Sequence, residues 1–339
     1  MPLVIDRSSR SQRNRFTSVR LDRLVERRDD AAWVDSALVA EDAHYVPLWR
    51  SRSLLENTDE GTIAVYLHPG ELERLDLIQP PTLLGTDDKR TYFAVSVTDK
   101  QRDEIIAARP WAEFADLRRH SIDMDAKHAG ILAYAKALHY WQHRHRFCGF
   151  CGNPTRLMSS GHRMVCSNSE CGRQTFPRID PAIIVLVTEG DACLLGRNAR
   201  WPAKRFSTLA GFVEPGESLE DAVAREVFEE SSVSLGDIHY VSSQPWPFPA
   251  SSMCGFYAEA TSRSMQTSEE LEELRWFTPS ELTDAVLAGD VLLSPPVSIA
   301  FQLLAGWFRQ QGGGELEDTY RQAQERRALR RRPTKKAAS

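Results

Sequence analysis

Residues 211–230 read Gly211-Phe-Val-Glu-Pro-Gly-Glu217-Ser-Leu-Glu-Asp-Ala-Val-Ala-Arg225-Glu226-Val-Phe-Glu229-Glu230, and this is the most informative stretch of the 339-residue chain. A loop with proline and glycine leads into a predicted helix from about residue 218 to 231. Three glutamates at 226, 229 and 230 stand at i, i+3 and i+4, so their carboxylates share one helix face. The opposite face is apolar, and we expect it to pack on a β-sheet; it consists of Leu219, Ala222, Val223 and Val227.

The clustered carboxylates suggest a metal site. Like charges on one helix face destabilise the helix by about 0.2–0.5 kcal/mol per pair unless a cation lies between them. Carboxylate oxygens favour Mg²⁺ or Mn²⁺, which keep coordination positions open for water and for phosphate oxygens. An acidic face exposed to solvent would have the same spacing, so the spacing alone leaves both interpretations open.

Four of the six cysteines lie within 24 positions, as a C-x2-C pair and a C-x4-C pair: Cys148, Cys151, Cys166 and Cys171. Two thiolate pairs on two turns are what a tetrahedral zinc site requires. Because four thiolates leave no coordination position open, this zinc would be structural. Free thiols in a loop are the alternative. Cys193 and Cys254 fall in apolar strands and are expected to be small core residues.

The chain predicts an α+β organisation in four parts. Residues 1–143 would form an N-terminal α+β domain, with short apolar stretches such as Trp33-Val34 as strands. Residues 144–176 would form a zinc ribbon, and 177–310 a domain that contains the carboxylate helix. Residues 311–339 are Gly-rich and then basic, and we expect them to lack fixed structure.

Periodicity places further elements in this scheme. Apolar residues recur at intervals of three and four over 126–143 and again near 298–309, which predicts two amphipathic helices. A continuous apolar run at 182–187 predicts a buried strand, with residues 192–195 as its hairpin partner.

The formal net charge of −5 is too small to indicate nucleic-acid binding by the whole molecule. The charge is uneven, because residues 325–339 hold seven basic residues and one acidic residue. A solvated charge run and an RNA contact both remain open for this tail. The longest apolar run has six residues, so we expect no membrane span and no secretory signal, and a cytoplasmic location.

A proline-rich stretch, Ser243-Gln-Pro-Trp246-Pro-Phe248-Pro-Ala-Ser251, follows the carboxylate helix. Three prolines in five residues exclude a helix or an inner strand, which predicts a stiff loop that presents Trp246 and Phe248. Flat aromatic faces can stack on a base or a nicotinamide ring. The alternative is a loop packed on the core.

Residues 211–230 resemble the signature of the Nudix hydrolases at nearly every position. The resemblance implies the Nudix α/β/α sandwich and metal-dependent cleavage of a nucleoside diphosphate linked to another group. It implies that Glu226, Glu229 and Glu230 are metal-binding and catalytic, that the carbonyl of Ala210 can bind the same metal, and that Glu217 and Arg225 form a structural ion pair.

The four-cysteine ribbon and the SQPWPFPxS stretch are similar to those of the NADH pyrophosphatase (NudC-type) branch of that family. The resemblance covers about residues 115–305. The N-terminal domain ahead of them is weakly similar to the branch and Nudix-like. This implies hydrolysis of NADH or NAD⁺ to AMP and nicotinamide mononucleotide, removal of the NAD cap from RNA 5′ ends, and a homodimer with no membrane partner. It implies one structural Zn²⁺ per chain and catalytic Mg²⁺ or Mn²⁺, with Glu270 as a further metal carboxylate; Glu269 and Glu272 leave that register open. The substrate-binding residues that it implies are Arg119, Phe176, Phe212, Gln244, Pro245, Trp246, Pro247, Phe248, Pro249, Ala250, Ser251 and Ala300.

Two positions depart from the family pattern. Ser232 stands where a glycine usually ends the helix, and Gly161 stands where some relatives have a substrate-contacting glutamate. The alternative functions are a Nudix hydrolase of another dinucleotide or of ADP-ribose, and a zinc-ribbon RNA-binding protein with a vestigial Nudix domain.

Overall fold

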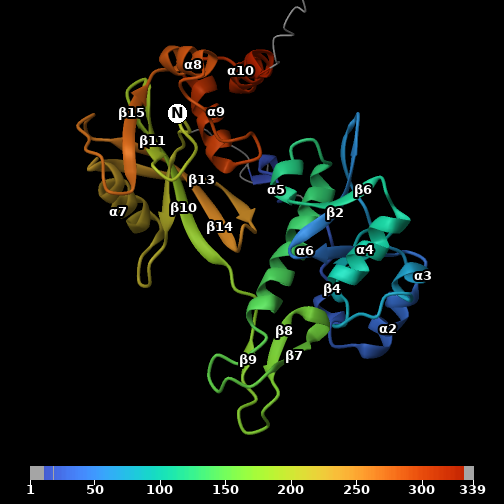
Figure 1. The fold of residues 1–339 in the computed structure, drawn as a ribbon. Helices are drawn as coiled ribbons and strands as arrows, with labels where there is room; N and C mark the ends of the chain where they lie inside the picture. Colours follow the sequence, from blue (N-terminus) through green and yellow to red (C-terminus); the bar gives the residue numbers. More distant parts are fainter. Residues whose placement is uncertain (1–10, 18, 332–339) are drawn as a thin grey trace, which may run out of the picture. The chain divides into compact units, whose positions relative to one another are not determined.

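The computed structural model describes residues 11–17 and 19–331. These residues divide into two compact units, each described here by itself (Figure 1). The N-terminal unit contains residues 15–180 and, from the other end of the chain, residues 245–252. The C-terminal unit contains residues 181–244 and 253–331 together with residues 11–14.

The N-terminal unit contains a mixed sheet with strands in the order β3-β2-β1-β5-β4, and β6 pairs with β2. Side chains of β1 alternate between two cores, as the period of a strand requires. Val46 and Leu48 pack in the core that contains α6, whereas Tyr45 packs in the core with Trp33 of α2 and Ile105 of α4. The elements are η1 (Val25–Arg27), α2 (Ala31–Val39), β1 (Ala43–Trp49), β2 (Arg52–Thr58), β3 (Gly61–Ala64), α3 (Pro69–Leu72), β4 (Thr82–Thr86), β5 (Thr91–Ser96), α4 (Asp99–Ala108), β6 (Ala112–Ala115), α5 (Leu117–His120) and α6 (Ala126–Arg144).

The cysteine-containing segment forms a small antiparallel sheet of β7 (Thr155–Met158), β8 (Arg163–Cys166) and β9 (Gln174–Thr175), with η2 (Ser159–Gly161) between β7 and β8. Its inner edge is held to the N-terminal domain by buried hydrogen bonds. The Gln142 side-chain amide donates to the Gly161 carbonyl at 2.8 Å, and His162 Nε2 lies 2.7 Å from the Leu83 carbonyl. The segment predicted as a separate ribbon, 144–176, therefore shares one unit with the predicted N-terminal domain.

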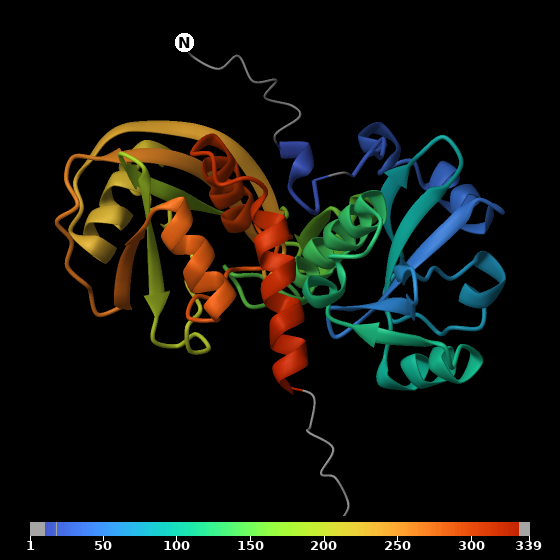
Figure 2. The same cartoon turned by 90° about the horizontal axis from the view of Figure 1, so that it is seen from above.

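The C-terminal unit is a sheet with α7 on one face and α8 and α9 on the other (Figure 2). Strand β10 packs Ile183 and Val185 with α7, and Ile184 and Leu186 with α8 and α9. The strand order is β13-β14-β10-β11-β15, and β12 pairs with β10. This arrangement confirms the expected α/β/α sandwich. The elements are β10 (Asp180–Glu189), β11 (Ala192–Asn198), β12 (Leu209–Phe212), α7 (Leu219–Ser231), β13 (Leu235–Trp246), β14 (Ser251–Ala260), β15 (Leu271–Phe277), α8 (Pro279–Ala288), α9 (Ile299–Gln310) and α10 (Leu316–Arg331).

The predicted hairpin and the three predicted amphipathic helices are confirmed as β10–β11, α6, α7 and α9. The prediction of a strand at Trp33-Val34 is wrong, because these residues lie in α2. The Asp30 carboxylate accepts a hydrogen bond from the Trp33 amide and so caps the first turn of that helix. Cys193 is buried in the core beside α8 and α9, and Cys254 is half-buried against the core beside α7, in line with their expected place as small core residues.

The expectation of an unstructured tail is wrong for residues 316–331, which form α10. Leu316 is fully buried in the core of the C-terminal unit, and the ring of Tyr320 packs edge-on against Phe301 of α9. An ion pair between Arg309 and Glu315 closes the glycine turn ahead of the helix. These apolar contacts compensate for the polar composition of the segment. Residues 332–339 of the predicted tail lie outside the described residues.

No helix in the described part of the chain is long and apolar enough to cross a membrane.

Candidate active site

Arg225 organises the loop that leads into α7. Its guanidinium binds the Glu217 carboxylate through two contacts, of 2.5 Å from Nε and 2.9 Å from Nη2, and Nη2 also donates to the Phe212 carbonyl at 2.9 Å. This bidentate pair lowers the pKa of Glu217 to about 2. Nη1 of the same side chain lies 3.0 Å from Glu226 and from Glu229. The predicted ion pair of Glu217 and Arg225 is confirmed, and it ties the loop to the helix.

Glu226 lies directly against β12 at Gly211. A Cβ atom at position 211 would be only 1.8 Å from Cδ of Glu226 and 2.0 Å from one of its carboxylate oxygens. Only glycine leaves the carboxylate in this position, because any side chain at 211 would force the Glu226 side chain to move away. Burial raises the pKa of Glu226 and the neighbouring Arg225 opposes that rise.

Glu230 is the most buried of the three helix glutamates, with 8% of its surface exposed. The Ala210 amide donates to its carboxylate, while Oε2 is buried and has no hydrogen-bond partner among the described residues. Burial, followed by the charges of Glu226 and Glu270, raises the pKa of Glu230 to about 8. A buried carboxylate oxygen without a donor is costly unless a cation or a proton satisfies it.

The exposed segment before β15 contributes Glu270, whose charge acts on both Glu226 and Glu230. Of the two alternatives for this position, Glu272 forms an ion pair with Arg197 of β11; Glu269 and Glu270 are both exposed, and the charge of Glu270 is the one that acts on the helix glutamates. The structure thus favours Glu270 as the downstream member of the carboxylate cluster.

These carboxylates fit a divalent cation by three observations. Oxygen is the donor type that Mg²⁺ and Mn²⁺ prefer, Gly211 leaves a cradle that a side chain would fill, and Oε2 of Glu230 is a buried acceptor without a partner in the described part of the chain. The carboxylate oxygens are spaced more widely than the cysteine sulfurs: in the described residues, the four cysteines form the one group of metal-binding side chains whose ligand atoms all lie within 4.8 Å.

The four cysteine sulfurs converge as a closed metal site requires. Sγ of Cys151 and Cys166 are 3.4 Å apart, and Sγ of Cys148 and Cys171 are 3.9 Å apart. The Asn153 amide donates to Cys151 and lowers the pKa of that thiol to about 6. Four converging sulfurs could bind zinc as a structural ion. His143 is exposed, and neither it nor His145 joins the group.

The proline-rich stretch does not stand free of the protein. β13 continues to Trp246, residues 247–250 form a turn, and β14 begins at Ser251. The rings of Trp246 and Phe248 are half-buried and pack edge-on against Phe16, with centroid distances of 6.1 and 5.6 Å. The Lys136 ammonium lies 5.5 Å from the centre of the Phe248 ring. The structure therefore favours the alternative of a loop packed on the core.

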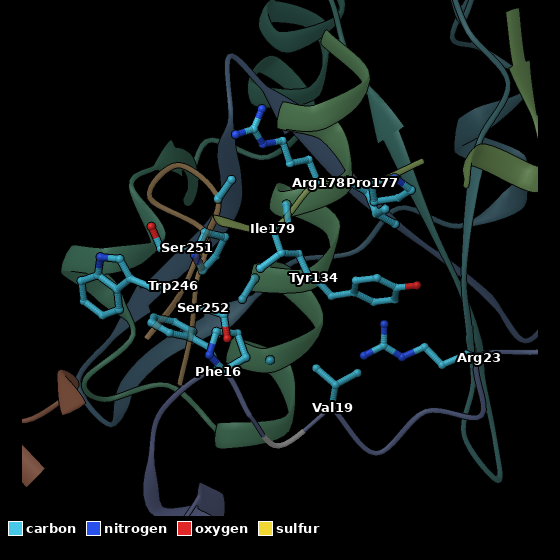
Figure 3. Close-up of a pocket in the computed structure, with 17 residues that line it drawn as sticks. Phe16, Val19, Arg23, Tyr134, Pro177, Arg178, Ile179, Trp246, Ser251 and Ser252 are labelled. Carbon is cyan, nitrogen blue, oxygen red and sulfur yellow. The ribbon is translucent and has the colours of Figure 1, made fainter. Parts of the chain in front are cut away.

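A cavity of about 240 Å³ lies beside this loop within the N-terminal unit. Figure 3 shows Ile179 and Ser252 between Trp246 and Tyr134, with the Tyr134 ring beside the Arg23 guanidinium, which is 3.8 Å from the ring centre. Its wall brings together these predicted substrate-binding residues: Pro245, Trp246, Pro247, Ala250 and Ser251. Phe176 itself is exposed and directly precedes Pro177 of the wall.

Comparisons with known proteins identify both halves of the chain. Residues 178–294 match the family model of the NUDIX domain, and residues 42–141 match that of the NADH pyrophosphatase-like rudimentary NUDIX domain. A NAD-capped RNA hydrolase NUDT12 of Macaca fascicularis is 33% identical, covering 87% of this chain and 73% of the relative. The chain belongs to the Nudix hydrolases, in their NADH pyrophosphatase branch.

Further relatives of this Nudix hydrolase cover less of it. The NAD-capped RNA hydrolase NudC of Stutzerimonas stutzeri is 44% identical over 51% of this chain and 63% of the relative. A solved NUDIX hydrolase from Nitrosomonas europaea is 20% identical, with a TM-score of 0.41 over 50% of this chain and 94% of that one.

Two predicted substrate-binding residues of this Nudix chain are buried rather than open. Gln244 is fully buried, where its side chain donates to the Val297 carbonyl at 2.7 Å and accepts from the Ile299 amide at 2.8 Å. These bonds hold the start of α9, on which Ala300 is also buried. The geometry favours a supporting role for both residues.

The other predicted contacts are exposed and divide between the units. Phe212, at the end of β12 in the C-terminal unit, is 60% exposed, and Arg119 is exposed on α5 of the N-terminal unit. Tyr134, Arg23 and Ile179 of the cavity wall were not predicted. Tyr134 lies on α6, which the sequence predicts only as an amphipathic helix, and no motif distinguishes its ring from the core positions around it.

Proposed function

We propose that this Nudix hydrolase cleaves the pyrophosphate of NADH or NAD⁺ to AMP and nicotinamide mononucleotide, and removes the NAD cap from RNA 5′ ends. The observation that carries the proposal is the carboxylate cluster of α7 against β12, where Glu226 lies against Gly211 and Glu230 has a buried oxygen without a partner among the described residues. Relatives of this branch that are named NAD-capped RNA hydrolases support the choice of substrate.

The residues that would hold Mg²⁺ or Mn²⁺ are Glu226, Glu229, Glu230, Glu270 and the carbonyl of Ala210. Such an ion, when bound, neutralises charge that develops on phosphoryl oxygens and lowers the pKa of bound water. Water adds to one phosphorus and the P–O–P bridge breaks, so one proton must leave the water. One of the three α7 carboxylates, Glu226, Glu229 or Glu230, accepts that proton.

Exposed aromatic rings are suited to the flat parts of the substrate. Phe212 and Phe176 are each 60% exposed, and stacking of a base on such a ring contributes about 1–3 kcal/mol. We assign each ring to the base or the nicotinamide, Phe212 in the C-terminal unit and Phe176 in the N-terminal unit, where the wall of the cavity beside Trp246 is a further candidate for substrate contact.

The proposal includes a structural Zn²⁺ on the four cysteines, a homodimer and a cytoplasmic location. Four thiols without disulfides are suited to a reducing compartment. Metal analysis of the purified chain and light scattering after gel filtration test the zinc content and the dimer.

The decisive experiment measures kcat/KM for NADH, NAD⁺ and NAD-capped RNA side by side, with Mg²⁺ and with Mn²⁺, and identifies the products by mass. We expect AMP and the nicotinamide mononucleotide from free dinucleotides, and RNA with a 5′-monophosphate from capped RNA. Higher kcat/KM for ADP-ribose or another dinucleotide would replace the substrate assignment. RNA binding without any hydrolysis would contradict the enzyme assignment for this substrate class.

A further inference from the structure

The segment around the cysteines has a charge opposite in sign to the rest of the chain. Between residues 144 and 178 there are six arginines and a single glutamate, Glu170, although the whole chain has a net charge of −5. The two negative charges of a zinc tetrathiolate would still leave the segment net positive. The arginines are Arg144, Arg146, Arg156, Arg163, Arg173 and Arg178.

The strand register places two of these arginines on one face of the small sheet. Arg156 pairs with Val165 and Met158 pairs with Arg163, and side chains two residues apart on a strand point the same way. The other face of the sheet contains the buried Met164 and Cys166. The outer face presents the exposed Arg156, whereas Arg163 is partly buried and lies 3.6 Å from the Asp29 carboxylate, which compensates part of its charge; the inner face holds Met164 and the metal-type ligand Cys166.

Exposed aromatic rings lie among these arginines. Phe147 and Phe150 are 63% and 71% exposed, although phenylalanine is normally buried. The Arg173 guanidinium lies 4.0 Å from the centre of the Phe150 ring. Alternating guanidinium groups and open aromatic faces are typical of surfaces that bind single-stranded nucleic acid, because arginine pairs with phosphate and the ring stacks on a base.

A cavity of about 390 Å³ lies where α6 meets this segment. Arg144 and Arg178 contribute cations to its wall, and Tyr140 and Trp141 contribute rings. Trp141 is almost fully buried, and its Nε1–H has no acceptor among the described residues. Asp180 also lines the cavity and pairs with Arg178 at 2.8 Å, so part of that positive charge is already compensated.

We propose that the cysteine segment binds the RNA chain of capped substrates, as single-stranded nucleotides downstream of the cap. The inference rests on the proposed function, since it assigns the body of the same RNA substrate. Phe176, the proposed stacking residue for the cap, lies between Arg173 and Arg178 in sequence. RNA fits better than an acidic peptide, because a peptide gives Phe147 and Phe150 no flat base to stack on.

The test uses the full chain with three exposed arginines replaced, R146Q/R156Q/R173Q. Its matched control removes three exposed cations elsewhere in the same unit, R20Q/R74Q/K89Q. Binding of an uncapped single-stranded RNA of about 16 nucleotides is followed by fluorescence anisotropy over a range of salt. The slope of log K against log salt is negative, and each lost phosphate contact reduces its magnitude by about 0.7. For R146Q/R156Q/R173Q we expect the salt slope to be shallower by about 2 and the RNA affinity to be weaker by at least about tenfold. For the control variant we expect no change in either quantity.

A second variant, F150A, tests the stacking. It should weaken RNA binding by about tenfold and leave the salt slope unchanged, since it removes no charge. Both variants should keep wild-type zinc content and melting temperature. With NAD-capped RNA their kcat/KM should fall, while kcat/KM for NADH stays within about twofold of wild type.

The outcomes separate the two proposals. If R146Q/R156Q/R173Q keeps the RNA affinity and the salt slope of the wild type, the proposal that this surface binds RNA is wrong, whatever the hydrolytic activity of the variant. The same follows if the wild type binds polyglutamate as tightly as it binds RNA, because the surface would then attract any polyanion. Failure of the wild type to hydrolyse NADH and capped RNA would overturn the proposed function, while the binding measurement would still test the RNA surface.

Discussion

Gly211 and Glu226 are fitted to each other: a Cβ on residue 211 would lie 1.8 Å from Cδ of Glu226. G211A should therefore push the carboxylate away from β12. We expect kcat/KM for NADH to fall about 10- to 100-fold, as for loss of a positioning contact at a metal site. G236A on β13 is the control, because the nearest atom to a Cβ there is 3.8 Å away. Wild-type kcat/KM in G211A would show that the position of Glu226 is not needed.

E230Q keeps the shape of the Glu230 side chain and removes its charge. We expect kcat to fall at least about 100-fold, because the amide cannot replace an anionic ligand at the carboxylate cluster. The melting temperature should be unchanged or higher, since Glu230 is buried and one of its oxygens has no partner among the described residues. E220Q on an exposed turn of the same helix should retain wild-type kcat. Near-normal turnover in E230Q would contradict the proposed mechanism.

Ser232 ends α7 in the left-handed conformation, with φ of 57°, where the family usually has glycine. A side chain in that conformation costs about 1 kcal/mol relative to glycine. S232G should therefore raise the free energy of unfolding by about that amount, measured by urea denaturation. S234G, two residues on and without a positive φ, should give no gain. If S232G also fails to stabilise, the Ser232 conformation is not strained.

Buried His162 should make the protein less stable in acid. Burial, with smaller effects of Arg28 and Arg23, lowers the pKa of His162 to about 4, whereas the unfolded value is about 6.5. Between these values the unfolded chain binds more protons, so stability rises with pH and this contribution is complete above about pH 6.5.

The His162 contribution lost at pH 5 is about 2 kcal/mol. H162Q can still donate to the Leu83 carbonyl but does not titrate. The difference in unfolding free energy between about pH 7.5 and pH 5 should thus be about 2 kcal/mol smaller in H162Q than in the wild type. Equal pH dependence in the two proteins would show that the pKa of His162 is the same in the folded and unfolded states.

The sequence predicts the elements that depend on local pattern. The spacing of the glutamates and the apolar face of α7 locate that helix, and two cysteine pairs locate the metal-type site. Contacts between distant residues escape such reasoning. The ring of Phe16, 230 positions away in sequence, packs against the ring of Trp246. Aromatic residues of a motif that suggests exposed rings can therefore be half-buried in the structure.

Polar residues of a motif pose a similar difficulty. Gln244 belongs to the proline-rich stretch, yet its side-chain amide forms hydrogen bonds with the backbone of Val297 and Ile299. Nothing local indicates which polar side chain will find such partners. The tail shows the converse, because burial of Leu316 outweighs a composition that favours disorder.

Arg225 gives the acidic turn of α7 a resident cation, shared among Glu217, Glu226 and Glu229. The turn can therefore fold before any divalent ion arrives. The helix can therefore form first and the metal bind second, so a chelator that removes the divalent ion should abolish hydrolysis while leaving α7 folded.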